Sequence, residues 1–129
     1  DPRQPVLVGT LVNVDRLHES SRFGRIFSEQ IAGRMVQRGV RVVELKLRDS
    51  VALQRDQGEL LLSREVREVS QSHDAQAVVV GTYAASASAL YISLKLVTPV
   101  GNTVVAAHNY AVPMDENVRV LLASGGLRY

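Results

Sequence analysis

Residues 77–112, AVVVGTYAASASALYISLKLVTPVGNTVVAAHNYAV, carry the clearest structural pattern in the chain. The region contains three runs rich in Val, Ile, Leu, Thr and Tyr: AVVVGTY, LYISLKLVT and TVVAAHNYAV. Small-residue turns at 86–88 and 99–102 separate these runs. Such runs joined by short turns predict consecutive strands that pair in antiparallel fashion. The sequence therefore predicts an antiparallel meander in the second half of the chain.

The residues before this meander follow a different pattern. Residues 5–14, PVLVGTLVNV, predict a buried strand, and residues 40–47, VRVVELKL, predict another. Between them, Ser20 or Ser21 is expected to cap a helix whose apolar residues recur at helical spacing until Gly39 ends it. Gly33 inside this helix predicts close packing against another element. A strand, a helix and a strand in this order predict a right-handed crossover between parallel strands.

The rest of the chain completes an α/β fold. Residues 51–53 predict a short edge strand followed by the polar turn RDQGE, and Ser63 is expected to cap a second helix. Asp115 is expected to cap a short helix near the C-terminus. We therefore predict one domain over 1–129, ordered from about 5 to 123. It holds a mixed five-stranded sheet, in which βαβ crossovers precede the meander, with two main helices and a short C-terminal one.

Composition narrows the class of protein. The chain has 129 residues, of which 46% are hydrophobic and 22% charged, as in soluble globular domains. No stretch approaches the ~18 consecutive apolar residues of a membrane-spanning helix. Cysteine is absent, which excludes disulfides, zinc–thiolate sites and cysteine nucleophiles. The chain begins at Asp1 without an initiating Met, so we expect any signal peptide or lipid-bearing Cys to lie upstream.

A search for catalytic patterns gives none. Neither a Gly-x-x-x-x-Gly-Lys nor a Gly-x-Gly-x-x-Gly loop occurs, and there is no Gly-x-Ser-x-Gly elbow. His18, His73 and His108 lack a metal-binding partner at helical spacing. Carboxylates such as Glu65 and Glu68 alternate with arginines, which is typical of a solvated surface. The sequence therefore predicts no enzyme, no cofactor and no metal.

Nucleic acid is not predicted as a partner either. The formal net charge is only +2, and acidic residues interrupt the arginines at 34, 38 and 41. The chain has six aromatic residues, four Tyr and two Phe, so stacking platforms beside these charges are scarce. The partners we expect are other protein subunits, a second copy of the chain among them.

The charge pattern of the meander raises an interface hypothesis. Lys95 is the one charged residue between Ala75 and Met114, whereas a solvated sheet face normally carries alternating polar residues. Pairing with turns near Ser86 and Gly101 places one set of residues on the core face: Val79, Gly81, Tyr83, Leu90, Ile92, Leu94, Leu96, Val105 and Ala107. The opposite face then collects Val78, Val80, Thr82, Val104 and Ala106 together with six candidate interface residues: Tyr91, Ser93, Lys95, Val97, His108 and Tyr110.

Two alternatives remain for that opposite face. The domain's own helices cover it if the two crossovers run in opposite directions, and part of it stays open otherwise. A one-residue bulge, for instance at Gly81, would exchange part of the face assignment.

Five strings together resemble the FlgO family of bacterial outer-membrane proteins associated with the flagellum. They are RFGRIFSEQ at 22–30, QRGVRVVELKLRDS at 37–50, QGELLLSRE at 57–65, DAQAVVVGTY at 74–83 and PMDENVRVLL at 113–122. They span most of the chain in the family's order. FlgO domains are also similar to the amino-terminal domain of TolB, which implies an α/β fold with a mixed sheet.

The resemblance implies a function outside catalysis. Family members look like lipoproteins, so the expected place is the cell envelope, in the periplasm or at the outer membrane, with membrane contact only through an upstream lipid anchor. The expected role is a structural subunit of a flagellum-associated ring that supports motility. The alternative is a periplasmic binding module for a peptide or protein partner.

Eight residues of the matching strings have expected structural roles. Phe23 and Phe27 supply an apolar helix face, and Gly24 lets the first turn approach a neighbour. Glu29 is expected to cap or bridge the turn at Gln57–Glu59, and Gly81 to mark a bulge or a close backbone approach. The set is Phe23, Gly24, Phe27, Glu29, Gly58, Glu59, Gly81 and Asp115.

Overall fold

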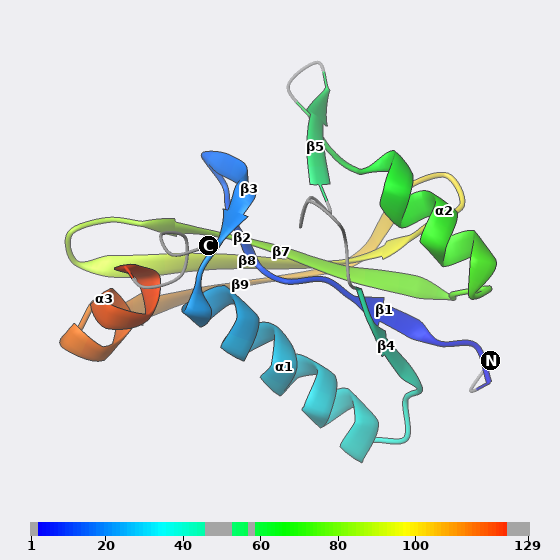
Figure 1. The fold of residues 1–129 in the computed structure, drawn as a ribbon, viewed down its shortest axis with the longest axis horizontal. Coiled ribbons are helices and arrows are strands. Elements are labelled where there is room, and N and C mark those ends of the chain that lie inside the picture. The colour runs from blue at the N-terminus through cyan, green and yellow to red at the C-terminus, as the bar shows by residue number, and fades with distance from the viewer. Residues whose placement is uncertain (1–2, 46–52, 57–58, 124–129) are drawn as a thin grey trace.

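The computed structural model describes residues 3–45, 53–56 and 59–123 (Figure 1). In the first half each of two helices follows three short strands, and three long strands followed by a helix make up the second. In chain order the elements are β1 (Val6–Val8), β2 (Val12–Asn13), β3 (Arg16–Ser20), α1 (Arg22–Gln37), β4 (Val42–Glu44), β5 (Leu53–Asp56), β6 (Glu59–Leu62), α2 (Arg64–Ser72), β7 (Ala77–Ala85), β8 (Ala89–Thr98), β9 (Thr103–Pro113) and α3 (Glu116–Ala123).

Within the described residues, seven strands form one sheet around β7. On one side β7 pairs with β8, which pairs with β9, and both pairs are antiparallel. On the other side β7 pairs in parallel with β1 and, further along, with β2. Strand β1 in turn pairs in parallel with β4, and β2 pairs in antiparallel fashion with β3. Since β1 and β2 share one position and β4 and β3 another, the strands occupy five positions. The expected mixed α/β sheet with crossovers and a meander is confirmed.

The two crossovers run in opposite directions, which places their helices on opposite faces of the sheet. From β1 through α1 the chain moves outward to β4, and from there through α2 it returns past β1 to β7. Right-handed crossovers in opposite directions cover opposite faces. Figure 1 shows α1 on one side of the sheet and α2 on the other. We call these two sides the α1 face and the α2 face.

The strand expected over 5–14 is interrupted at Leu11. The backbone N–H of Leu11 donates to Ser28 Oγ of α1 over 3.0 Å instead of to a neighbouring strand. On either side of the break the chain stays on β7, because Gly9 N–H donates to Val79 O and Val14 N–H to Tyr83 O. The break therefore separates β1 from β2 without moving the chain away from its neighbour.

Helix α1 begins and ends close to the expected residues. Ser21 is its N-cap and accepts from the Gly24 N–H at 3.1 Å, while Gly39 follows the helix at a φ of +85°. The helix residues buried against the sheet are small: Gly24, Ser28 and Ala32. The expectation of close packing at Gly33 is wrong, because a Cβ there would have no atom within 4 Å.

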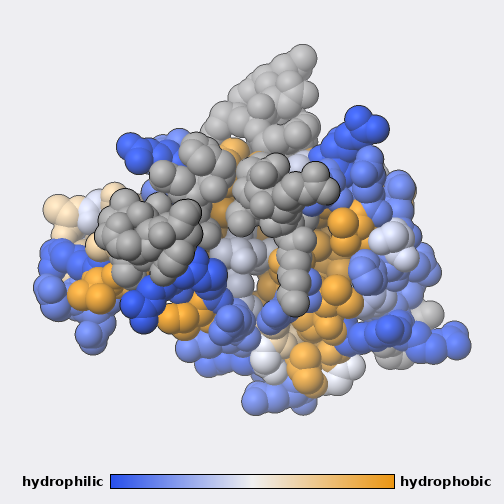
Figure 2. Space-filling view, in the orientation of Figure 1, coloured by the Kyte–Doolittle hydropathy of each residue, from blue (hydrophilic) through white to orange (hydrophobic). Residues whose placement is uncertain are grey.

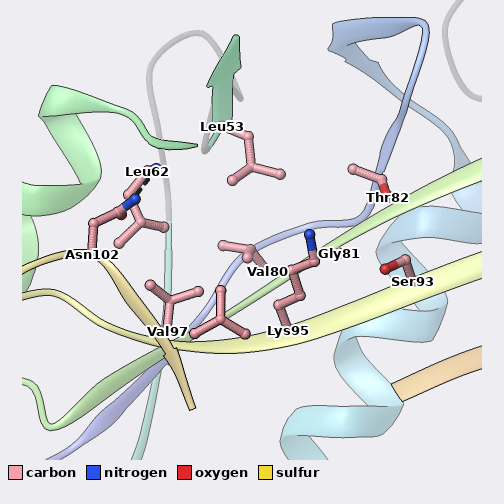
Figure 3. Close-up of a pocket in the computed structure, with 10 residues that line it drawn as sticks. Leu53, Leu62, Val80, Gly81, Thr82, Ser93, Lys95, Val97 and Asn102 are labelled. Atoms are coloured by element: carbon pink, nitrogen blue, oxygen red, sulfur yellow. Dashed lines mark hydrogen bonds between the residues drawn. The ribbon is translucent and has the colours of Figure 1, made fainter. Parts of the chain in front are cut away.

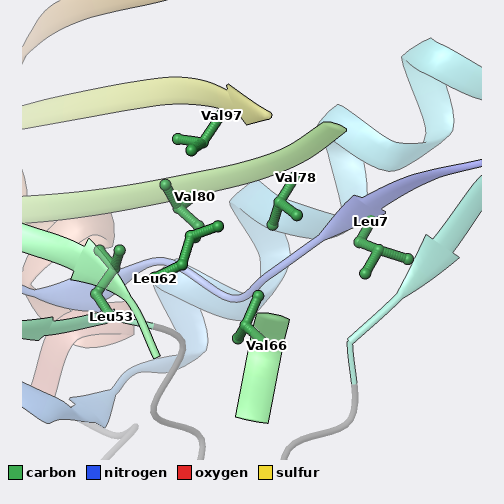
Figure 4. Packing of buried hydrophobic residues seen from close by; sticks show 7 residues of the cluster. All are labelled: Leu7, Leu53, Leu62, Val66, Val78, Val80 and Val97. Carbon is green, nitrogen blue, oxygen red and sulfur yellow. The ribbon is translucent and has the colours of Figure 1, made fainter. Parts of the chain in front are cut away.

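Three apolar clusters hold the layers together. On the α2 face, Val66 of α2 and Leu53 and Leu62 of the β5–β6 hairpin pack on the sheet (Figure 4). That cluster consists of Leu7, Leu53, Leu62, Val66, Val78, Val80 and Val97. On the α1 face, one cluster centres on Leu11, Tyr83, Leu90, Ile92 and Val118, and another on Val6, Val8, Ala32 and Val79. The core is thus divided between both faces of the sheet.

The β5–β6 hairpin differs from the expectation for its segment. We expected an edge strand at 51–53 and a polar turn over RDQGE. The two strands instead pair along their length, with Leu53 opposite Leu62 and Asp56 opposite Glu59. Arg55 and Asp56 therefore belong to a strand, while residues 51–52 and 57–58 lie outside the described part of the chain.

The register of the meander confirms the expected faces for β7 and β8 and corrects those for β9. Leu96 pairs with Ala106 but Val97 pairs with Val104, so a bulge leaves Val105 without a partner. Beyond the bulge every β9 side chain changes face. Ala106, His108 and Tyr110 therefore lie on the α1 face, and Ala107 lies on the α2 face, opposite to the sequence-based assignment.

Candidate interaction surfaces

The outer edge of β9 is the longest uncovered strand edge in the described structure. All but one of its eleven residues are exposed, the exception being half-buried Val112. The exposed fractions reach 50% at Val104, 54% at Val105 and 42% at Tyr110. No residue from Thr103 to Pro113 is an Asp, Glu, Lys or Arg. Natural proteins usually protect such edges with charges, because their unpaired N–H and C=O groups attract another strand.

The α2 face of the sheet is only partly covered. Its half nearer β1 lies under α2 and the β5–β6 hairpin. On β8 and β9 the same face carries 53% exposed Tyr91 and the small exposed residues Ala107, Asn109 and Ala111. This half of the α2 face therefore adjoins the free edge of β9, and together they form one continuous surface.

The six residues predicted to form an interface do not share one face. Tyr91, Ser93, Lys95 and Val97 lie on the α2 face, but Val97 is only 4% exposed because it belongs to the core under α2. His108 and Tyr110 lie on the α1 face because of the bulge. Their rings are 4.4 Å apart, and Tyr110 also meets Phe27 of α1 edge-on at 6.1 Å. Whether these residues contact a partner stays a prediction.

A small pocket lies between the β5–β6 hairpin and the sheet (Figure 3). Its walls are mostly apolar, and the side chain of Lys95 extends into it from β8. Thr82, Ser93 and Asn102 add polar groups, and Asn102 Oδ1 accepts from the Leu62 N–H over 3.3 Å. None of the described carboxylates forms an ion pair with the half-buried Lys95. The pocket therefore offers one cation beside apolar walls.

Figure 2 shows one side of the molecule, where hydrophilic residues surround an apolar area over β1 and β4. Val40, Val42, Val43 and Leu45 at this edge are half-buried.

In the part of the chain that the structure describes, no three His, Asp or Glu side chains gather as metal ligands. None of the described helices combines the length and apolar content that a bilayer crossing requires.

Comparison with protein families identifies the chain. The FlgO protein family matches residues 1–117. The chain belongs to the FlgO family. No curated protein matches its sequence.

Solved structures share the fold of this FlgO domain at low sequence identity. The PelC dodecamer from Paraburkholderia phytofirmans is 12% identical, with a TM-score of 0.59 over 96% of this chain and 84% of that one. The LpoB C-terminal domain from Salmonella enterica is 12% identical, with a TM-score of 0.58 over 87% and 84%. Lipoprotein GNA1162 from Neisseria meningitidis is 12% identical, with a TM-score of 0.54 over 88% and 82%. At this identity the likeness concerns the fold alone.

The residues of the FlgO-like strings lie mainly where α1 meets the sheet. Phe23 and Phe27 pack on the cluster around Leu11, and Phe23 also meets Tyr83 edge-on at 6.1 Å. Gly24 lies so close to Leu11 that a Cβ on it would collide with the Leu11 carbonyl oxygen. These positions join the N-terminal half of α1 to the interrupted strand.

The remaining family-string residues have separate places. Gly81 packs under side chains, since a Cβ would lie 2.8 Å from Leu94 and 2.9 Å from Leu11, and the bulge lies instead at Val105 of β9. Asp115 Oδ1 accepts from the Val118 N–H at 2.8 Å and so caps α3. Glu29 is exposed beside Arg25 and Glu44. Its expected contact with the turn at 57–59 involves Gly58, which is outside the described residues, and Glu59, of which only the backbone is described.

Two contact groups were not predicted from the sequence. Ser28 accepts from the backbone of Leu11 and donates to Gly24 O at 2.8 Å, so it joins the helix to the strand break. Asn102, at a φ of +52°, bridges the β8–β9 turn to the β5–β6 hairpin. The spacing of Gly24, Ser28 and Ala32, four residues apart, is the sequence signal that indicates a close helix contact at the first of these groups.

Proposed function

We propose that this FlgO domain is a non-catalytic structural subunit of the bacterial cell envelope, acting in a flagellum-associated ring that supports motility. Membership of the FlgO family carries this proposal. The long, exposed and uncharged β9 supports it, because such an edge is costly to maintain unless a partner uses it. The relevant chemistry is association between proteins.

Assembly with further copies of the same chain is part of this proposal. A protein with the same fold, PelC, forms a dodecamer. Ring subunits need surfaces that pair with a neighbouring subunit. We expect the domain to associate in solution in a concentration-dependent way, which mass measurement by analytical ultracentrifugation checks. A monomer at millimolar concentration would contradict this part.

The role in the cell is tested by deleting the gene in the source organism. We expect slower spreading in swimming assays, restored by the wild-type gene, and the protein in the envelope fraction. Normal swimming together with a cytosolic protein would overturn the proposal. A screen for hydrolysis and nucleotide turnover checks the absence of catalysis, because an activity abolished by one point substitution would contradict it.

A second candidate function is a periplasmic binding module, and the pocket around Lys95 favours it. Lys95 is half-buried and forms no ion pair with a described carboxylate, so it can attract the carboxylate of a ligand, and the apolar walls suit an aliphatic side chain. The test titrates the labelled domain with short peptides that end in Leu. Shifts in the NMR signals of Thr82 and Ser93 that are lost in Lys95→Met would support this function, and unchanged spectra would exclude it for these peptides.

A further inference from the structure

The strand β9 has the geometry of a self-pairing edge. An antiparallel pair of equal strands related by a two-fold axis places residue i of one strand opposite residue j of the other, with i + j constant. Between the bulge and the end of the strand, β9 is regular over Ala106–Val112, and Asn109 is its middle residue. Pro113 lacks an N–H and so ends the segment that a second strand can use.

The chemistry of this segment permits a copy of itself as the partner. With the axis at Asn109, Ala107 lies opposite Ala111 of the other copy, and His108 lies opposite Tyr110. The segment has no Asp, Glu, Lys or Arg, and its one histidine, His108, lies opposite Tyr110, so pairing brings no like charges together. The side chains on the α2 face are small and exposed, so a second strand approaches without steric obstruction.

The other edge of the sheet is a poorer partner for β9. It consists of β4 with three residues and β3 with five, whereas β9 has eleven. Both short strands carry charged residues, Glu44 in β4 and Arg16 in β3. Pairing with either would leave most of β9 uncovered and would place its apolar side chains beside these charges. Length and charge both favour a second β9.

We propose that two copies of this domain pair through their β9 strands in antiparallel fashion, with a two-fold axis at Asn109. This interface rests on the proposed assembly role and assigns one of its contacts; because a two-fold pair closes at two copies, a ring requires a second surface besides β9. Pairing joins two sheets into one continuous sheet and satisfies the outward N–H and C=O groups of both edges. The contact extends along about 24 Å, at ~3.4 Å for each of the seven regular residues.

Cysteine crosslinking tests this geometry directly, because the chain has no cysteine of its own. Opposed residues in antiparallel strands have Cα atoms about 4.5–5.5 Å apart, which a disulfide can span. We expect Asn109→Cys to crosslink with itself under mild oxidation. Ala107→Cys and Ala111→Cys should crosslink when mixed and remain uncrosslinked when alone. Crosslinking of all three with themselves, or of none, would overturn the proposal.

Charge substitution at the axis gives a second test that does not depend on oxidation. Asn109 is exposed, so Asn109→Lys and Asn109→Asp should fold normally, and each should weaken self-association by at least about tenfold because identical charges meet at the axis. An equal mixture of the two should associate again. Val36→Lys, at a 57% exposed position on α1, is the control and should associate like the wild type.

The outcomes separate this interface from the assembly role. Association that persists in both Asn109 variants contradicts the β9 pair and leaves the assembly role intact. Weakened association without recovery in the mixture shows that β9 meets a different surface, which also overturns the two-fold pair. A monomeric wild-type domain contradicts the self-assembly part of the proposed function, and with it this interface.

Discussion

At the contact between α1 and the sheet, Gly24 and Ser28 act on the same residue, Leu11. The Leu11 N–H donates to Ser28 Oγ, and its carbonyl oxygen occupies the space that a Cβ on Gly24 would need. A strand that breaks here needs another acceptor for its N–H group, because a buried unpaired donor is costly. At the break, the Ser28 hydroxyl therefore supplies an acceptor for the Leu11 N–H, and Gly24 leaves room for the Leu11 carbonyl oxygen.

Gly24→Ala should destabilise the domain by about 1–3 kcal/mol, because the added methyl meets backbone atoms that cannot rotate away. Gly33→Ala is the matched control on the same helix. It should stabilise the domain by about 0.5–1 kcal/mol, since its methyl points into open space and alanine is the better helix former. Urea unfolding measures both, and changes of the same sign would contradict the packing described for Gly24.

Ser28→Ala should cost about 1–3 kcal/mol, because it leaves the Leu11 N–H buried without an acceptor. Ser70 of α2 provides the comparison. It is also buried and donates to the carbonyl four residues earlier, Val66 O, over 2.7 Å, but none of the described backbone N–H groups donates to its hydroxyl. Ser70→Ala should therefore cost less. Equal losses in denaturant unfolding would show that the bond to Leu11 contributes nothing.

At the scale of elements, the sequence predicted those whose pattern is local. Hydrophobic runs and turn residues located β7, β8 and β9, and Ser21, Ser63 and Asp115 cap the three helices. The bulge beside Val97 could not be predicted, since Val104 and Val105 are equally suited to either face. One extra residue there moved His108 and Tyr110 to the α1 face, so two of the six predicted interface residues were assigned to the wrong face.

The interruption at Leu11 and the β5–β6 hairpin depend on distant contacts. Leu11 finds its acceptor seventeen positions away in α1, and Leu62 finds one forty positions away at Asn102. No local pattern of the strand 5–14 signals the first contact. The polar residues RDQGE at 55–59 indicated a turn, but Leu53 and Leu62 anchor the hairpin to the core and so extend its strands.

The two tyrosines of the meander should respond differently to the same substitution. Tyr91→Glu should change the free energy of unfolding by less than about 0.5 kcal/mol, because the side chain is 53% exposed on the open α2 face. Tyr110→Glu should cost about 1 kcal/mol or more, since it removes the ring contact with Phe27. Thermal and urea unfolding measure both losses, and a larger loss at Tyr91 would contradict the register of β9.

In the whole molecule, the helices and the β5–β6 hairpin cover the sheet unevenly. β7 is buried along nearly all its length between β8 on one side and β1 and β2 on the other. Helices α1 and α3 cover the α1 face, and α2 with the hairpin covers part of the other. Protection therefore falls from β7 toward β9, where the described sheet ends in a strand whose outer edge is unpaired and which has no Asp, Glu, Lys or Arg.

Amide hydrogen exchange should show this gradient and its response to assembly. In dilute solution, exchange should be slowest in β7 and fastest, among the strands of the meander, in β9, because edge amides open without global unfolding. As the protein concentration rises, amides in Ala106–Val112 should become protected. Alternate N–H groups of this segment point away from β8, and the carbonyl groups of a second β9 accept hydrogen bonds from them. The amides of β4 at the other edge are the internal control and should not change. Protection that appears in β4 while β9 stays fast would show that subunits meet at the opposite edge.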